Sequence, residues 1–414
     1  MKHRRNGKPI AICTSALVAA ALAPAAHAFD VTAGDWKLSV SGNVNADYIY
    51  SNCESTPVVV GGGLACAGDS NGNKSSSVSN GLLPAALAIS GSTTQSGYDI
   101  GVTFGLYPGI STNDGGSPNI QGNANNTPPN TALGTAGLDV RQVFLTFGNK
   151  DWGTILAGRN IGLFGADAIL NDMTLLGVGG GNGNYASPTN TSLGSIGLGY
   201  IYTDWLAQID YTTPDLSGAK ITVGIFNPLN SLTGNGATVK KEPGFHAKVA
   251  YTLGDLYLSG TFLYQKQADP GIGLFPPFSY NGHAFDIGGK YKIDNFEVAA
   301  WYYNGKGVGT TGLFVLSADD AGNPRNSDGF LAQVTYKLAN TKLGVNYGQS
   351  KLDLASGEVN PTLLSKNDKY TLGVYQSLTS NLIVLAEFST IKSEAQDGLS
   401  NTSRNFNIGA FVSF

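Results

Sequence analysis

Two cysteines of the sequence are placed where they could react with each other. Cys53 and Cys66 lie 13 positions apart in a segment rich in Gly, Ser and Asn. Such a pair can form a disulfide in an oxidising compartment, or it can serve as a metal or redox pair. The gap is not C-x-x-C, and neither His246 nor His283 is nearby, which favours the disulfide. It would close a short loop and stabilise the fold by ~3 kcal/mol.

Residues for acid–base or nucleophilic catalysis are scarce. His246 and His283 are the only histidines after residue 28, and no G-x-S-x-G stretch has the strand–turn–helix context of a catalytic serine. The glycine-rich stretch 177–183 lacks the Lys-Ser/Thr of a phosphate loop. We therefore expect no enzymatic activity, no cofactor and no metal site.

The N-terminus has the pattern of an export signal. A small-residue apolar stretch, 10–23, is followed by an A-x-A cleavage pattern at 26–28. Four basic residues precede the apolar stretch: Lys2, Arg4, Arg5 and Lys8. The sequence thus predicts a signal peptide, 1–28, and a mature chain, 29–414. Cleavage removes these four basic residues and no acid, so the formal charge of −4 becomes about −8, which speaks against nucleic acid as a partner.

The composition excludes several classes of protein. Only 13% of the residues are charged, whereas soluble α/β enzymes carry about 25%. The mean hydropathy of −0.04 and the absence of long apolar runs beyond the N-terminus exclude a bundle of membrane helices. With 56 glycines and 37 Tyr plus Phe, the chain is typical of an all-β protein whose surface is not highly charged.

Apolar and polar residues alternate along much of the chain, and the strands that this pattern predicts must position any site. From Trp36 to Tyr50, apolar and small residues alternate with polar ones, which predicts a strand with one apolar and one polar face. The pattern returns at Phe245–Leu253, Phe285–Tyr291 and Phe330–Tyr336, and again at the C-terminus. A half-exposed strand of a soluble sandwich and a tilted strand across a bilayer both fit one such segment, but the repetition along the chain favours the membrane.

Short polar turns alternate with long loops rich in Gly, Asn, Ser and Pro. An even number of strands with one short and one long set of connections is the bacterial outer-membrane pattern, and such a sheet must close because its backbone cannot bond to lipid. A barrel of this size keeps a water-filled lumen. The sequence predicts 16 strands, at 36–50, 79–90, 97–107, 138–148, 152–159, 196–211, 219–227, 244–253, 256–264, 283–292, 296–304, 328–338, 341–350, 367–377, 381–391 and 403–414.

Several stretches of the chain resemble a known family. They are 139–147 (DVRQVFLTF), 151–160 (DWGTILAGRN), 171–173 (NDM) and 209–218 (IDYTTPDLSG). In this order they resemble the Gram-negative general porins, which are trimeric 16-stranded transmembrane barrels. The motifs cover about a quarter of the mature chain. The resemblance implies an all-β, 16-stranded antiparallel barrel with short periplasmic turns, long external loops and a third loop folded into the lumen.

The resemblance also implies roles for individual residues. The third loop, predicted at 160–195, would narrow the lumen to an eyelet, where loop acids face basic residues of the wall. Asp167 and Asp172 match the loop acids, and Arg141 and Arg159 match the basic wall. For Arg159 and Asp167, a structural salt bridge that holds the loop is an equal alternative. The alternating final strand, with Phe406 and the terminal Phe414, resembles the family's assembly signal.

Arg141 poses a conflict between pattern and resemblance. It shares its parity with Val143, Leu145 and Phe147, so alternation places it on the lipid side, where an arginine at mid-bilayer would cost ~2–4 kcal/mol. The resemblance places it in the lumen, which we favour, with the apolar run covered by the in-folded loop or by another subunit.

The sequence also departs from the family. Asn43 stands where a lysine is frequent, and the loop has no second acid after Met173, which predicts weak charge selectivity with a slight cation preference.

The function that the resemblance implies is passive diffusion. The chain would be an outer-membrane porin, a water-filled channel for small hydrophilic solutes and ions. The alternative is a substrate-specific channel with a saturable binding site. The implied partners are the lipid bilayer with its lipopolysaccharide, the β-barrel assembly machinery and two further copies in a homotrimer. Weak alternation at 79–90, with Pro84 inside a strand, and at 138–159 suggests a wall that faces another subunit.

Overall fold

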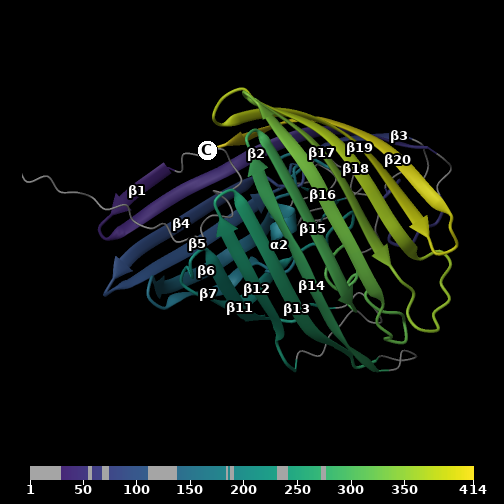
Figure 1. Ribbon diagram of the computed structural model, residues 1–414, viewed down its shortest axis with the longest axis horizontal. Helices are drawn as coiled ribbons and strands as arrows, with labels where there is room; N and C mark the ends of the chain where they lie inside the picture. The colour runs from purple at the N-terminus through teal and green to yellow at the C-terminus, as the bar shows by residue number, and fades with distance from the viewer. Residues whose placement is uncertain are drawn as a thin grey trace, which may run out of the picture.

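One antiparallel sheet curls round and meets its own first strand (Figure 1). The computed structural model describes residues 29–54, 58–67, 74–110, 138–182, 185–186, 191–230, 241–271 and 277–414. The predicted signal peptide, 1–28, lies outside these residues. Among the helices of the described residues, none is long and apolar enough to cross a membrane.

The strands follow the chain round the barrel, each paired with the next. The sheet contains 18 strands, but β3 and β4 share one position beside β2, and β1 continues the line of β20, so the barrel is 16-stranded, as predicted. In chain order the strands are β1 (Phe29–Ala33), β2 (Trp36–Cys53), β3 (Lys74–Ser79), β4 (Ala86–Gln95), β5 (Tyr98–Pro108), β6 (Leu138–Asn149), β7 (Gly153–Ile161), β8 (Tyr185–Ala186), β9 (Thr191–Ser192), β10 (Trp205–Thr212), β11 (Ala219–Phe226), β12 (Gly244–Leu253), β13 (Leu256–Asp269), β14 (Phe278–Ile293), β15 (Phe296–Lys306), β16 (Asn326–Leu338), β17 (Thr341–Leu352), β18 (Leu364–Ser377), β19 (Leu382–Ala395) and β20 (Ser400–Ser413).

The last strand closes the barrel on the first. β20 pairs with β2 from Asn43↔Ser413 to Cys53↔Ser403. The terminal Phe414 adds two backbone bonds with Gly42, at 2.9 and 3.0 Å. Every long strand of the ring therefore has a neighbour on both sides, whereas the short strands β1 and β3 pair only with β2. A neighbour on both sides is the condition for a strand that crosses a bilayer.

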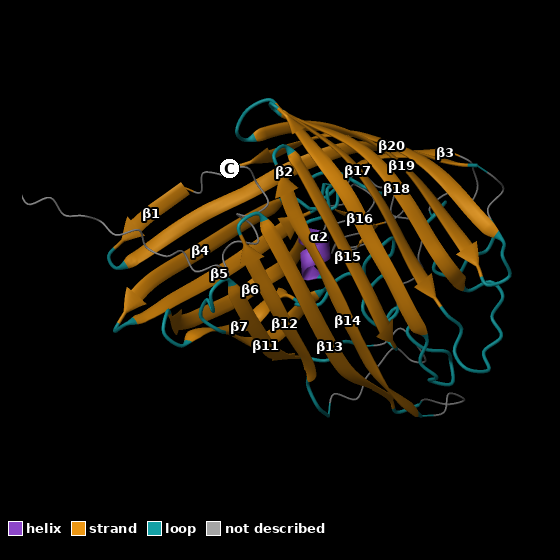
Figure 2. Ribbon diagram, viewed as in Figure 1, coloured by secondary structure: helices purple, strands orange, loops and turns teal. Residues whose placement is uncertain are grey.

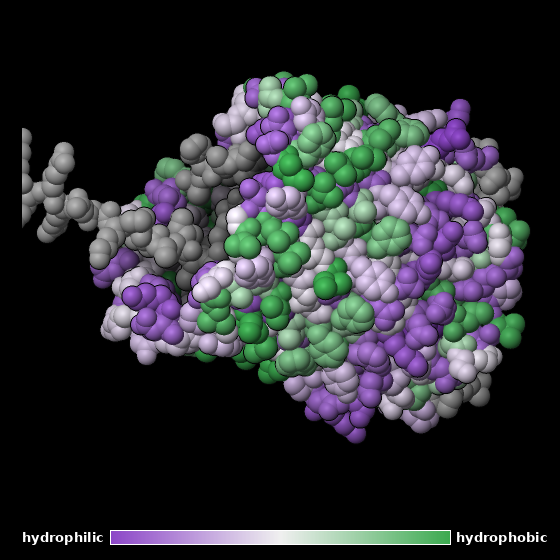
Figure 3. Space-filling model, in the orientation of Figure 1, coloured by the Kyte–Doolittle hydropathy of each residue, from purple (hydrophilic) through white to green (hydrophobic). Residues whose placement is uncertain are grey.

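The period of two sorts side chains between an apolar outer face and a polar inner face. On β14, Phe285 and Ile287 are exposed on the outer face, whereas Asp286 between them is buried inside. Aromatic pairs bridge neighbouring strands on the outside, such as Phe285 with Tyr302, whose ring centroids are 6.3 Å apart. Figure 3 shows green and pale side chains across the middle of one face, with purple ones gathered toward the end with the long loops.

The predicted strand 79–90 is wrong, because residues 80–85 leave the wall and enter the lumen. Pro84 has no N–H for a ladder, and Asn45 takes over the backbone bonds there: its amide donates to the carbonyls of Leu83 and Pro84, and its oxygen accepts from Gly81 N–H. The weak alternation at this place thus reflects an inward turn of the chain.

The predicted strand 196–211 is also too long at its start. Strand structure begins at Trp205, and residues 196–204 belong to the third long loop, which runs from 162 to 204. Gly197 and Gly199 have positive φ values of 70° and 146°, which an extended strand does not accommodate. The loop carries helix α2 (Ala166–Leu170), which lies inside the barrel (Figure 2).

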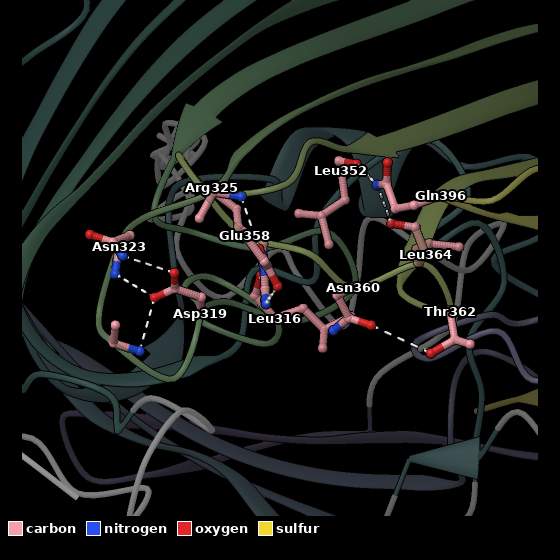
Figure 4. Close-up of polar contacts among 12 residues, drawn as sticks. Leu316, Asp319, Asn323, Arg325, Leu352, Glu358, Asn360, Thr362, Leu364 and Gln396 are labelled. Carbon is pink, nitrogen blue, oxygen red and sulfur yellow. Dashed lines mark hydrogen bonds and ion pairs between the residues drawn. The ribbon is translucent and has the colours of Figure 1, made fainter.

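Other loops pack together at the long-loop end of the barrel. A disulfide joins Cys53 and Cys66. Between β15 and β16, and between β17 and β18, two loops are joined by Arg325 and Glu358, whose side chains are 7% and 8% exposed (Figure 4). The guanidinium donates twice to the carboxylate, at 2.5 and 2.8 Å, and once to Leu316 O at 3.1 Å. This bond from Arg325 holds the pKa of Glu358 below its ordinary value of 4.5.

Candidate functional site

The third loop is bound by polar side chains to one side of the barrel, β12 to β19, which we call the anchored wall. Near the start of the loop, Asp167 accepts hydrogen bonds from Lys248 Nζ at 2.6 Å and Tyr257 Oη at 3.0 Å. Gly165 N–H donates to Asp286 at 2.7 Å. Asp167 is 7% exposed and paired, so it holds the loop; of the two alternatives, the structure places it in a salt bridge, with Lys248 and not with Arg159.

Asp172 is likewise turned into the protein. Its Oδ1 accepts from the backbone and hydroxyl of Thr174, at 3.0 and 2.8 Å, and its Oδ2 accepts from Tyr200 Oη at 2.9 Å. The adjacent Met173 N–H donates to Gln333 Oε1 on β16 at 2.9 Å. Asp172 therefore fixes the conformation of the loop.

The far part of the loop is held by two buried charges of the wall. Lys369 on β18 donates to Gly179 O, Gly194 O and Ser195 Oγ, at 2.7, 2.9 and 2.7 Å. Glu387 on β19 accepts from the N–H groups of Val178 and Gly179, at 2.9 and 2.7 Å. Backbone groups that would otherwise be buried without partners are thus satisfied by the wall.

The side of the barrel formed by β4–β7 and β10, which we call the open wall, carries Arg141. Here β5 and β6 are out of register by one residue: Gly105 faces Gln142 and Leu106 faces Val140, so Arg141 is the extra residue of a β-bulge. A bulge reverses the alternation on its two sides. Val143, Leu145 and Phe147 are therefore exposed on the outer face, while Arg141, of the same parity, is buried in the lumen.

This placement resolves the conflict in the sequence differently from our explanation. The sequence predicts that the apolar run is covered from inside or by another subunit. Instead the run faces outward, and the bulge reverses the parity at Arg141 so that this side chain faces the lumen. Arg141 Nε donates to Asp139 Oδ2 at 2.8 Å. The guanidinium lies over the rings of Tyr107 and Trp205, 5.3 and 5.8 Å from their centroids.

Arg159 is not part of the inner wall, so its predicted role at the constriction is wrong. It pairs with Val143 on β6 and with Ala207 on β10, both exposed, and directly opposed residues share one face of a sheet. Its Nε donates to Val140 O at 3.0 Å. The inward position is that of the next residue, Asn160, which accepts from Gln142 at 3.0 Å.

A chamber of about 310 Å³ lies between the third loop and the open wall. Among the residues that the structure describes, Arg141 is the only charged one lining it, and most of the others are apolar. The open wall contributes Tyr107 and Trp205, and the third loop contributes Ile169 and Leu193. The narrowed part of the lumen is thus an apolar space with one paired arginine, whereas the resemblance implied acids and bases across a gap.

Comparison with known proteins agrees with the barrel and its in-folded loop. The family described as "Gram-negative porin" matches residues 14–396. The chain belongs to the Gram-negative porin family. Among curated proteins, none matches the sequence.

Solved structures share the fold at low sequence identity. The outer membrane channel DcaP of Acinetobacter baumannii has a TM-score of 0.67 at 15% identity, covering 92% of this porin and 99% of that chain. The anion-selective porin from Comamonas acidovorans has a TM-score of 0.61 at 14%, covering 92% and 100%. OmpF of Salmonella typhi, in complex with daunomycin, has a TM-score of 0.57 at 12%, covering 93% and 100%.

The two phenylalanines of the predicted assembly signal do not line the chamber of this porin. Phe406 and Phe414 are exposed on the outer face of the closing strand. The residues that hold the third loop, Lys248, Lys369 and Glu387, were missed as site residues. Alternation alone could have placed Lys248 inside the barrel, because it lies on the polar face of its strand.

Proposed function

We propose that the porin forms a water-filled outer-membrane channel for the passive diffusion of small hydrophilic solutes and ions. The observation that supports this best is the third loop, which crosses the lumen and leaves an unfilled chamber against the open wall. A barrel of this strand number is too wide for its wall side chains to fill, so an in-folded loop sets the size limit for solutes. The barrel domain is the mature chain, 29–414.

Charge selectivity should be weak, with a slight preference for cations. Asp167 and Asp172 are bound within the loop and its anchored wall, and Arg141 is paired with Asp139. No uncompensated charge of the described residues therefore lines the chamber. The formal charge of about −8 on the mature chain leaves a weak negative field, which attracts cations.

Purified protein in planar bilayers tests both statements. We expect stepwise conductance that rises linearly with salt concentration, and a reversal potential in a salt gradient slightly on the cation side. Strong anion preference would contradict the selectivity, and a complete absence of conductance steps would contradict the channel.

The route to the membrane and the assembly belong to the same proposal. Export would use the signal peptide 1–28, and insertion would use the assembly machinery, which would read the final strand with Phe406 and Phe414. In the outer membrane the apolar outer face would contact lipid and lipopolysaccharide. We propose a homotrimer; among the neighbours, OmpT of Vibrio cholerae has been solved in a trimer form. Migration as an SDS-resistant trimer before boiling, and as a monomer afterwards, tests it.

A second function is favoured by the lining of the chamber. A general diffusion pore needs only an aqueous gap, whereas apolar side chains gathered around a cavity are typical of a binding site. A substrate-specific channel with a saturable site would show current that is blocked by its substrate and flux that levels off with concentration.

A further inference from the structure

The chamber is apolar because separate parts of the chain each turn apolar side chains toward it. Leu82 and Leu83 come from the inward turn after β3, Leu193 comes from the third loop, and Phe411 comes from β20. Val315 comes from the loop between β15 and β16. These segments lie far apart in the sequence, so the lining is not the by-product of one apolar stretch.

The third loop has two different sides, one toward the anchored wall and one toward the chamber. On α2, Asp167 binds the anchored wall, while Ile169 and Leu170 line the chamber. Further along, Leu193 lines the chamber and is only partly buried, and the neighbouring Ser192, which also borders the chamber, has its hydroxyl bonded to Val178 O within the loop. The loop thus has polar partners on the side of the anchored wall and presents mostly apolar side chains to the chamber.

The aromatic residues of the open wall have their polar atoms satisfied within the protein. Trp205 Nε1 donates to Tyr202 Oη at 2.7 Å. Tyr107 Oη donates to Gln142 Oε1 at 2.6 Å. Their rings, tilted by 39° with centroids 5.9 Å apart, therefore offer the chamber flat apolar surfaces beside the guanidinium of Arg141.

These features define the solute that the chamber fits. Its volume of about 310 Å³ lies at the lower end of the range for small-molecule pockets, ~300–1,000 Å³. Apolar surface facing water is unfavourable, and a solute that covers it with its own apolar surface gains affinity. Because Arg141 is paired with Asp139, the lining carries no net charge that would favour an ion.

We propose that the chamber is a binding site for small uncharged solutes that carry an aromatic or alicyclic ring next to a polar head group. This inference rests on the proposed channel function and names the class of solute that the channel prefers. The ring inserts between the open wall and the loop, while the polar head group stays in the water of the lumen.

The test uses two sugars that differ only in the apolar group. Phenyl β-glucoside and methyl β-glucoside are added to single channels in planar bilayers. We expect phenyl glucoside to block the current in a saturable manner, at a concentration about tenfold or more lower than methyl glucoside, because of the extra apolar surface that it buries. Equal block by both sugars, or no block by either in a conducting channel, would overturn the inference and leave the channel function standing.

Substitutions of leucines that line the chamber test whether phenyl glucoside binds there. Leu170→Asn and Leu193→Asn keep the branching and the number of side-chain heavy atoms while replacing methyl groups by an amide, and each should weaken block by phenyl glucoside by about tenfold. Leu399→Asn is the matched control, because Leu399 is 54% exposed in the turn between β19 and β20, and it should leave block unchanged. Block that is unaltered in a folded Leu193→Asn porin would contradict the assignment to this chamber.

A readout that needs no conduction separates the two proposals. Trp205 lines the chamber, so phenyl glucoside added to the porin in detergent should change tryptophan fluorescence in a saturable manner, and Trp205→Phe should remove most of that change. A porin that shows this binding without any conductance would overturn the channel function alone. Conductance without block or fluorescence change would overturn the binding site alone.

Discussion

The anchored wall and the open wall enclose the same lumen but treat the third loop in opposite ways. The anchored wall meets the loop with buried charged and amide groups, such as Lys369, Glu387 and Gln333, and leaves little space between them. The open wall stands off from the loop and faces it with aromatic and aliphatic side chains across the chamber. Lys248, Lys369 and Glu387 of the anchored wall therefore serve to hold the third loop in place.

The difference follows from what an in-folded loop requires. Its backbone N–H and C=O groups lose water when the loop packs against a wall, and each must find a partner. The anchored wall supplies those partners from strands that are already rigid. With its polar groups satisfied there, the loop can present apolar residues to the other side without leaving a buried polar group unpaired.

The largest effect on stability is expected from removal of Lys369, which donates three hydrogen bonds from the anchored wall to the loop. Lys369→Met removes the donor to Gly179 O, Gly194 O and Ser195 Oγ and leaves these acceptors buried. We expect a loss of about 3–5 kcal/mol in the free energy of unfolding, as for other broken buried charge networks. Urea unfolding in lipid vesicles measures it, and single-channel conductance should rise because the loop is no longer held.

Lys351→Met is the matched control for this change. Lys351 is exposed at the long-loop end of β17, so its loss should leave both stability and conductance nearly unchanged. If Lys369→Met and Lys351→Met unfold at the same urea concentration, the loop does not depend on the anchored wall in the way described.

The next largest effect on stability is expected from loss of the disulfide, whose cysteines do not line the chamber. Cys66→Ser removes a link across 13 positions, which should lower the free energy of unfolding by about 3 kcal/mol. Its removal should leave conductance unchanged, because neither cysteine lines the chamber. Treatment of the wild type with a reductant gives the same comparison without a mutation, and unfolding that is identical before and after reduction would contradict the prediction.

A smaller, pH-dependent effect is expected for the two loops above the lumen. Since bonding to Arg325 lowers the pKa of Glu358 below 4.5, the pair stabilises the folded loops above that pH and loses its effect as the pH falls through the lowered value. Glu358→Gln should cost about 1.5–3 kcal/mol at neutral pH. Hydrogen exchange of residues 353–363 should rise in the wild type as the pH falls below 4.5, whereas the variant should exchange faster at neutral pH, lose the pH step and match the wild type at low pH.

Much of the barrel could be predicted from the sequence because its strands obey one local rule. Alternation, turn residues and the closure requirement were enough for hairpins such as 283–292 with 296–304, which the structure extends by only a few residues in β14 and β15. The prediction failed where a single residue interrupts the alternation of inward and outward side chains. The bulge at Arg141 reverses the parity of its strand, and the turn around Pro84 takes six residues, 80–85, out of the wall.

The site was less predictable because it is made by contacts between distant segments. Lys369 and Gly179 are 190 positions apart, and no local pattern relates a loop to the wall against which it folds. Arg159 was assigned to the lumen by resemblance alone, although its alternation with Ala157 and Ile155 places it outside. The acids Asp167 and Asp172 were placed on the correct loop, but which side of the loop they face depends on its tertiary fold.

The finest test separates the two arginines of the predicted basic wall. Arg141→Gln should leave Asp139 unneutralised beside the chamber and shift the reversal potential in a salt gradient toward cation preference, because the added negative charge attracts cations there. Arg159→Gln, on the outer face, should leave the reversal potential unchanged and alter the free energy of unfolding by no more than about 0.5 kcal/mol. Equal shifts from both substitutions would show that the selectivity comes from the overall charge of the barrel and not from the open wall.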